Sequence, residues 1–119
     1  MRYHQPMASF RTFAEFWPYY LREHSRPATR GLHYLGSSLV VACFVAVVLS
    51  GHAVFFLAMP LVGYFFAWVG HFLIERNRPA TFKHPLWSLA ADWRMWWLWI
   101  GGRIAPELEK SGVRSASRP

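Results

Sequence analysis

The chain has 119 residues and a formal net charge of +7, and 54% of its residues are hydrophobic. Its single cysteine, Cys43, excludes a disulfide bond or a thiolate metal cluster formed within this sequence. The positive charge alone would suit a nucleic-acid partner. The basic residues, however, gather on both sides of one long uncharged stretch, which is typical of a membrane protein, and we expect no nucleic-acid binding.

The first predicted element is an amphipathic helix over residues 10–24, with Ser9 as its N-cap. Its aromatic residues recur at helical spacing and form one apolar face. Because the segment is short and charged, we expect it to lie in the membrane interface or to insert only halfway. Residues 1–8 are predicted to form a flexible tail.

Two membrane-spanning helices are predicted next, at about residues 32–49 and 53–74. No Asp, Glu, Lys or Arg occurs between Arg30 and Glu75. As one helix this stretch would measure ~66 Å, twice the ~30 Å hydrocarbon thickness of a bilayer, so the Ser-Gly-His sequence near its middle is read as a turn. Basic residues flank the stretch and are absent from the turn, which places both termini in the cytoplasm.

The last predicted helix covers residues 85–100 and is amphipathic or half-inserted, with Pro85 in its first turn. Asp92 and Arg94 interrupt what would otherwise be a third membrane span. Residues 105–119 are polar and are expected to form a disordered tail. Residues 9–104 would then form a single integral-membrane helical domain.

An internal repeat indicates how these helices are arranged. Glu23–Thr29 (Glu-His-Ser-Arg-Pro-Ala-Thr) aligns with Glu75–Thr81 (Glu-Arg-Asn-Arg-Pro-Ala-Thr), and each copy lies between two predicted helices. The repeat predicts two αα-hairpins, the first two helices in one and the last two in the other, with both turns at the cytoplasmic end. The predicted fold class is an all-α membrane protein with a small four-helix arrangement.

Four of the six histidines fall at the same depth in this topology, at the cytoplasmic end of the helices. His52 would lie ~27 Å away across the membrane by helix rise, and His4 is on the tail. Glu75 is spaced i, i+4 from His71, so the two share a helix face. Imidazole suits iron, zinc, copper or nickel, so the sequence predicts a metal site with these candidate ligands: His24, His33, His71 and His84.

Three functions remain open on the residues alone. The first is a mononuclear metal enzyme; the sequence has no HxxxH or HxxHH cluster, which excludes the histidine-box di-iron hydroxylases. The second is a haem-binding electron-transfer or sensor protein with two axial histidines. The third is a small non-enzymatic membrane scaffold in which each histidine is an ordinary interfacial or capping residue.

Two motifs carry a resemblance to a known family. The pattern Tyr20-x3-His24-x2-Pro27-x5-His33, followed by Gly70-His71-x3-Glu75-x3-Pro79-Ala80, resembles the Mpo-like 2-hydroxy fatty acid dioxygenases. That family takes its name from the yeast member in phytosphingosine metabolism. The resemblance covers roughly residues 10–97.

The resemblance implies an Fe(II)-dependent membrane enzyme of fatty acid α-oxidation, which uses O2 to convert a 2-hydroxy fatty acid to the acid one carbon shorter with release of CO2. It makes His24, His33 and His71 the first-choice iron ligands. Glu75 would be a further ligand or a catalytic group that fixes a histidine tautomer. By position, Arg30 or Arg78 could pair with the substrate carboxylate.

The expected partners are a lipid-like 2-hydroxy fatty acid, O2 and membrane lipid. The expected location is a multi-pass position in a bacterial inner membrane or, in a eukaryote, in the endoplasmic reticulum. The sequence leaves the oligomeric state open.

Overall fold

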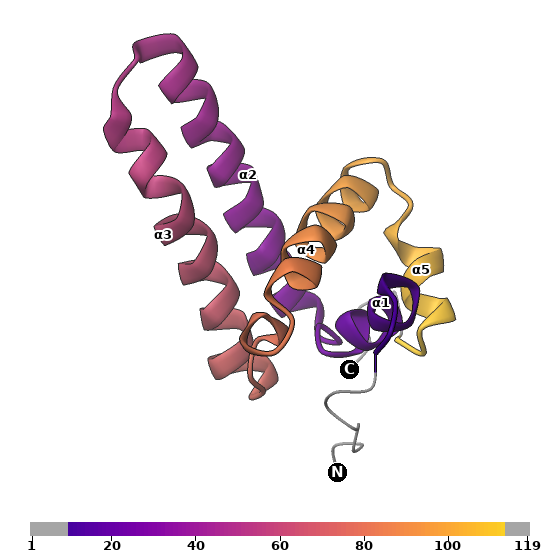
Figure 1. Ribbon diagram of the computed structural model, residues 1–119. Helices are drawn as coiled ribbons and strands as arrows, with labels where there is room; N and C mark the ends of the chain where they lie inside the picture. The colour runs from indigo at the N-terminus through magenta and orange to yellow at the C-terminus, as the bar shows by residue number, and fades with distance from the viewer. Residues whose placement is uncertain (1–9, 114–119) are drawn as a thin grey trace.

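The computed structural model describes residues 10–113, and every regular element in that range is helical. The elements in chain order are α1 (Phe13–Arg22), α2 (Pro27–Ser50), α3 (Ala53–Val69), the π-helical turn η1 (Gly70–Glu75), the 3₁₀ turn η2 (Ala80–Phe82), α4 (Pro85–Ile100) and α5 (Ile104–Lys110). Figure 1 shows α2 and α3 as a long antiparallel hairpin, with α4 beside its lower part and α1 and α5 grouped together. The predicted all-helical class is confirmed, with one helix more than expected.

Helix boundaries follow local backbone chemistry. The predicted cap of the first helix, Ser9, lies outside the described residues, and the Thr12 side chain accepts a hydrogen bond from the backbone of Glu15 instead. α2 begins at Pro27 rather than at residue 32, because proline suits the first helical turn, where its missing N–H needs no partner. The turn after α2 uses Gly51 at φ 74°, a conformation that glycine adopts without strain.

The α2–α3 hairpin has apolar side chains on its outer surface. Both Pro27–Ser50 and Ala53–Glu75 are long and apolar enough to cross a membrane, and only 17% and 6% of their most apolar windows are buried inside the protein. A core helix of a soluble protein would be mostly buried, so this exposure favours a lipid environment. Large exposed residues far from the other helices include Phe44, Val48, Leu49, Phe56 and Leu57.

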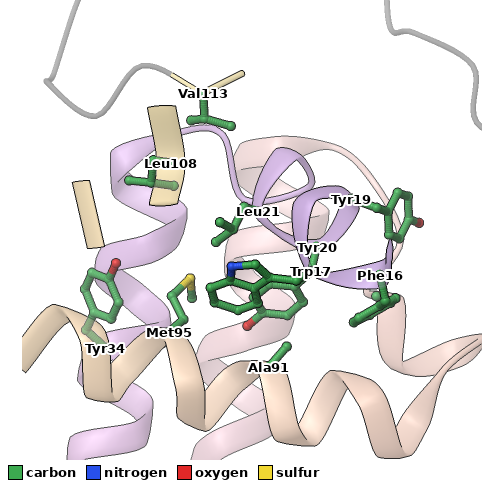
Figure 2. Close-up of a cluster of buried hydrophobic side chains, with 11 residues drawn as sticks. Phe16, Trp17, Tyr19, Tyr20, Leu21, Tyr34, Ala91, Met95, Leu108 and Val113 are labelled. Carbon is green, nitrogen blue, oxygen red and sulfur yellow. The ribbon is translucent and has the colours of Figure 1, made fainter. Parts of the chain in front are cut away.

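The buried core lies elsewhere, between α1, α4 and α5. Figure 2 shows its side chains, which come mainly from α1 and from the facing sides of α4 and α5: Phe16, Trp17, Tyr19, Tyr20, Leu21, Tyr34, Ala80, Ala91, Met95, Leu108 and Val113. This cluster fixes α1 and α4 against the lower end of the hairpin. It therefore positions the C-terminal end of α1, which His24 follows, and the N-terminal part of α2, which carries His33.

The expected disordered tail over residues 105–119 needs correction for the part that the structure describes. α5 forms at Ile104–Lys110, and the side chains of Leu108 and Val113 are buried against the core. The Trp17 indole also donates a hydrogen bond to the Glu107 carboxylate, 2.9 Å. These contacts offset the conformational entropy that the polar segment loses when it forms α5. Residues 114–119, like the predicted tail at 1–8, lie outside the described part.

The two copies of the repeat bond to each other at equivalent positions. The Ser25 hydroxyl donates to the Glu75 carboxylate, 3.1 Å, and the Asn77 amide donates to the Glu23 carboxylate, 2.9 Å. In each bond the first residue of one copy pairs with the third residue of the other. The two turns thus meet at one end of the molecule, as the repeat indicated. The most extensive helix packing nevertheless joins α2 to α3, and the division into two αα-hairpins stays a prediction.

Candidate metal centre

Three buried histidines from three elements converge at the lower end of the hairpin. His24 follows the end of α1, His33 is near the start of α2, and His71 belongs to η1. The Nε2 atom of His24 lies 2.9 Å from that of His71 and 3.1 Å from that of His33. One ligand atom from each side chain fits within 4.8 Å of the others. The structure therefore brings together three of the four histidines selected from the sequence.

The other nitrogen of each ring determines what these Nε2 atoms can do. Each Nδ1 faces an oxygen that can only accept: the carbonyl of Tyr20 for His24 (2.7 Å), the carbonyl of Thr29 for His33 (3.3 Å) and the side-chain carbonyl of Asn77 for His71 (2.7 Å). Each neutral ring thus carries its proton on Nδ1 and keeps a lone pair on Nε2. Three lone pairs directed at one another repel, and a bound cation turns that repulsion into ligation.

The Asn77 amide is oriented by a second contact. Its Nδ2 donates to the Glu23 backbone carbonyl, 3.0 Å, and to the Glu23 carboxylate, 2.9 Å. With both amide protons used, only Oδ1 is left to face His71. The bond between the repeat copies therefore also fixes the tautomer of a candidate ligand.

The turn that presents His71 has an unusual backbone. The helix widens to the π-helical turn η1 and ends at Arg76, whose φ of 62° is left-handed. This ending lets the Asn77 backbone N–H donate to the His71 carbonyl, 2.9 Å, and places the Asn77 side chain beside the ring. Single π-helical turns within α-helices are frequent at functional sites, which agrees with the position of this one.

A close approach of α2 to η1 sets the spacing of the triad. A Cβ atom added at Gly70 would lie 2.9 Å from the Thr29 side chain, so only glycine fits at this contact. Thr29 also supplies the carbonyl that faces His33. The glycine next to His71 thus lets two of the three ligand-bearing segments meet.

A small cavity adjoins the triad. Its volume is about 20 Å³, room for about one water or ion. Tyr20, Ser88 and Asp92 line it together with the histidines. A haem macrocycle does not fit between imidazoles this close together, so the geometry disfavours the haem alternative.

Asp92 is an acidic group beside the triad. Its Oδ1 accepts a hydrogen bond from the Tyr20 hydroxyl and lies 3.9 Å from the His33 Nε2. Burial raises the pKa of Asp92 to about 7, and the Tyr20 hydrogen bond acts in the opposite direction. Burial also lowers the pKa of His24 well below its ordinary value, and the neighbouring His71 and His33 lower it further. The His24 imidazole is thus neutral, the form that binds a metal.

Two of the predicted site residues are not members of the three-histidine group. His84 precedes α4, and its ring packs against Phe16 and Trp87 at centroid distances of 5.3 and 5.6 Å. It does not join the three-histidine group, because the packing of α4 on α1 turns it into the aromatic core. The Glu75 carboxylate accepts hydrogen bonds from the Ser25 hydroxyl and the Arg26 backbone N–H, so it braces the turn, and its role as a ligand or catalytic group stays a prediction.

The two arginines proposed for the substrate carboxylate have contacts within the protein. Arg30 is buried, and its guanidinium donates to the backbone carbonyls of His24 and Ser25 at 2.8 and 3.0 Å. It therefore braces the turn that carries His24. Arg78 is exposed and lies over the Phe82 ring, 5.2 Å from its centroid. The pairing of either arginine with a substrate carboxylate stays a prediction.

Sequence reasoning missed the roles of Tyr20, Asn77 and Asp92. Asp92 had a usable signal, since an acid within an apolar helix is costly and calls for a function. From the sequence alone, Asp92 indicates only the interruption of a span. Asn77 occupies a position of the repeat, but its contact with His71 depends on the left-handed residue before it.

The fold and the site define a small all-helical protein with a candidate metal centre of three buried histidines and two long apolar helices. A family model described as 2-hydroxy-palmitic acid dioxygenase Mpo1-like matches residues 10–104, and the chain belongs to this family. The resemblance seen in the sequence is thereby confirmed. Comparison with curated proteins found no match, and neither did comparison with solved structures.

Proposed function

We propose that this protein is an Fe(II)-dependent dioxygenase that converts a 2-hydroxy fatty acid to the acid one carbon shorter. The family description names a 2-hydroxy-palmitic acid dioxygenase. The observation that supports the proposal best is the convergence of three neutral imidazoles, each with its Nε2 lone pair directed inward. Three imidazole ligands suit iron and leave coordination positions for substrate.

The proposed reaction balances without a further reductant. The C1–C2 bond of the 2-hydroxy acid breaks, C1 leaves as CO2, and C2 becomes the carboxyl carbon of the shorter acid. The two carbons together supply all the electrons that O2 takes up, and water is the remaining product. Bound iron would supply the redox chemistry for O2 and a Lewis-acid anchor for the substrate oxygens.

The residues around the triad have separate tasks in this proposal. His24, His33 and His71 would hold the metal, and Asn77 fixes the orientation of His71. Asp92, which lies between His33 and the Tyr20 hydroxyl, is placed to accept a hydrogen bond from the 2-hydroxyl of the substrate. We assign this task to Asp92 rather than to Glu75.

The apolar hairpin supports a membrane location for this activity. Two helices long enough to span, with their apolar side chains facing outward, would anchor the protein in a bilayer. The triad lies at the end of the hairpin opposite the Gly51 turn, where α1 and α4 gather (Figure 1). A site at that depth would receive a lipid-like substrate from the adjacent leaflet. We also propose that both termini lie on the cytoplasmic side.

The test combines metal analysis with turnover. Detergent-purified protein reconstituted anaerobically with Fe(II) should hold about one iron per chain. It should consume O2 and 2-hydroxypalmitic acid and form the fifteen-carbon acid. Mass spectrometry detects this product. His71→Ala should lose both iron and turnover.

His52→Ala and His84→Ala are the matched controls and should keep stoichiometric iron, since neither side chain reaches the triad. Iron retained by His71→Ala would contradict the metal site. Iron bound without turnover of any 2-hydroxy acid would contradict the reaction but not the site. Absence of stoichiometric metal in the unaltered protein would favour the scaffold alternative.

A further inference from the structure

A groove leads from the triad along the hairpin. It lies between α2, α3 and α4 and has a volume of about 270 Å³. His33, Ala67 and Asp92 line the end near the triad, and Val40, Met59 and Pro60 line the other end. From His33 to Val40 the groove follows α2 for ~10 Å by helix rise.

The groove is continuous with the candidate metal centre. His33 and Asp92 line both the groove and the small cavity between the histidines. One molecule can therefore place one end at the triad and the rest in the groove. The polar groups lie at the triad end and the far end is aliphatic, so the groove matches a molecule with a polar head and an alkyl chain.

Its floor and its rim indicate how such a chain would lie. A Cβ atom added at Gly63 would be 3.3 Å from the Val40 side chain, so α2 and α3 are in contact beneath the groove. At the rim, Tyr64 and Leu89 are 44% and 50% exposed. The opening thus faces the same surroundings as the apolar outer surface of the hairpin, and a chain can enter sideways from lipid.

We propose that this groove binds the alkyl chain of the 2-hydroxy acid, with the carboxyl end at the triad and the chain directed towards Val40 and Met59. This inference rests on the proposed function and adds the determinant of chain length. Side chains at the far end set the longest acid that fits. An acyl chain of a resident membrane lipid would be the competing occupant.

The test enlarges a residue at the far end and measures chain-length preference. Val40→Phe should lower kcat/KM for long 2-hydroxy acids by roughly 10-fold or more for each methylene that no longer fits, while short acids keep their rate. Bound iron should not change. Leu61→Phe on α3 is the control, because Leu61 is 73% exposed and is absent from the groove lining, so its profile should match the unaltered protein.

A binding measurement separates this inference from the proposed reaction. Palmitic acid has no 2-hydroxyl for the proposed reaction, so its affinity in detergent reports binding separately from turnover. Val40→Phe should weaken palmitic acid binding by at least about tenfold, and Leu61→Phe should not.

Each other result has a definite reading. An unchanged chain-length profile in Val40→Phe, or an equal loss at every length, would overturn the groove assignment. Weaker palmitic acid binding in Val40→Phe without turnover of any 2-hydroxy acid would uphold the groove and overturn the reaction. Palmitic acid binding that Val40→Phe leaves intact would place the chain elsewhere and leave the groove to lipid.

Discussion

The uncharged side chain of Asn77 both joins the two copies of the repeat and orients the ring of His71. Its amide N–H groups donate to Glu23 and its oxygen accepts from the Nδ1 of His71, so it links the first repeat copy to the candidate ligand that precedes the second copy. A partner of this kind raises the basicity of the ligand nitrogen and holds the ring in place. Its contribution should therefore appear in metal affinity rather than in folding alone.

Asn77→Ala should lower the affinity for Fe(II) by roughly 10–100-fold, the usual loss when the outer partner of a histidine ligand is removed. Competition with a chelator of known affinity measures the change. Arg78→Ala is the neighbouring control, since the Arg78 side chain is exposed and lies over Phe82. Equal affinity in Asn77→Ala and the unaltered protein would show that the His71 orientation does not depend on the amide.

At the residue scale, the sequence predicted the three clustered histidines better than the residues that contact them. The depth argument selected His24, His33 and His71 because helix boundaries follow from hydrophobic runs and prolines. It also selected His84, since depth along the membrane normal says nothing about rotation around a helix. The ring of His84 turns into the aromatic core beside Phe16, which only the packing of α4 on α1 determines.

At the scale of elements, η1 and α2 approach each other closely where Gly70 meets Thr29. Gly70→Ala would place a methyl group 2.9 Å from the Thr29 side chain and push η1 away from α2. We expect a loss of about 1–3 kcal/mol in stability, typical of overpacking, together with weaker metal binding. Thermal unfolding in detergent and metal titration measure the two effects.

Gly31 provides the control for that substitution. It lies on the same helix as Thr29, and a Cβ atom there would meet nothing within 4 Å. Gly31→Ala should be neutral or stabilise the protein by about 0.4–1 kcal/mol, because alanine loses less conformational entropy in a helix. Similar behaviour of the two variants would mean that helix propensity, and not the close contact, governs Gly70.

The elements differ in how far the sequence determined them. α4 has the predicted bounds, since Pro85 and Gly101 mark both ends. The π-helical turn could not be predicted, because its widened spacing depends on the contacts of His71 and Gly70 rather than on composition. α5 was missed because a short polar helix has no periodic apolar signal, and its stability comes from two buried residues, Leu108 and Val113.

Leu108→Ala tests whether α5 is part of the folded unit. Leu108 is 1% exposed, so the truncation should cost about 2–5 kcal/mol, as for other buried leucines. Thermal unfolding should show this loss, while Leu86→Ala, at a site 79% exposed, should change little. A Leu108→Ala protein as stable as the Leu86→Ala protein would return residues 105–113 to the status of a dispensable tail.

At the scale of the whole molecule, basic residues and the apolar hairpin define two regions. Basic side chains precede α2 and follow η1, and the described turn at Gly51 has none. The positive-inside rule therefore predicts that this turn faces away from the cytoplasm. The exposed apolar surface of α2 and α3 supports the spanning part of that prediction and leaves the direction to experiment.

Cysteine labelling in intact cells determines the direction. In a Cys43→Ala background, His52→Cys should react with a membrane-impermeant maleimide added outside. Glu109→Cys should react only after the membrane is permeabilised. The reverse pattern would invert the topology, and labelling of both sites in intact cells would contradict a hairpin that crosses the membrane twice.

The length of the α2–α3 hairpin sets the depth of the triad relative to the membrane surface. From His33 to Ser50, α2 holds the histidines ~25 Å from the turn by helix rise. A spanning hairpin in a bilayer of different thickness must tilt or deform the lipid around it, which changes the height of the triad relative to the headgroups. The access of a lipid substrate would then vary with the acyl chain length of the surrounding lipids. The catalytic rate would therefore depend on the thickness of the bilayer.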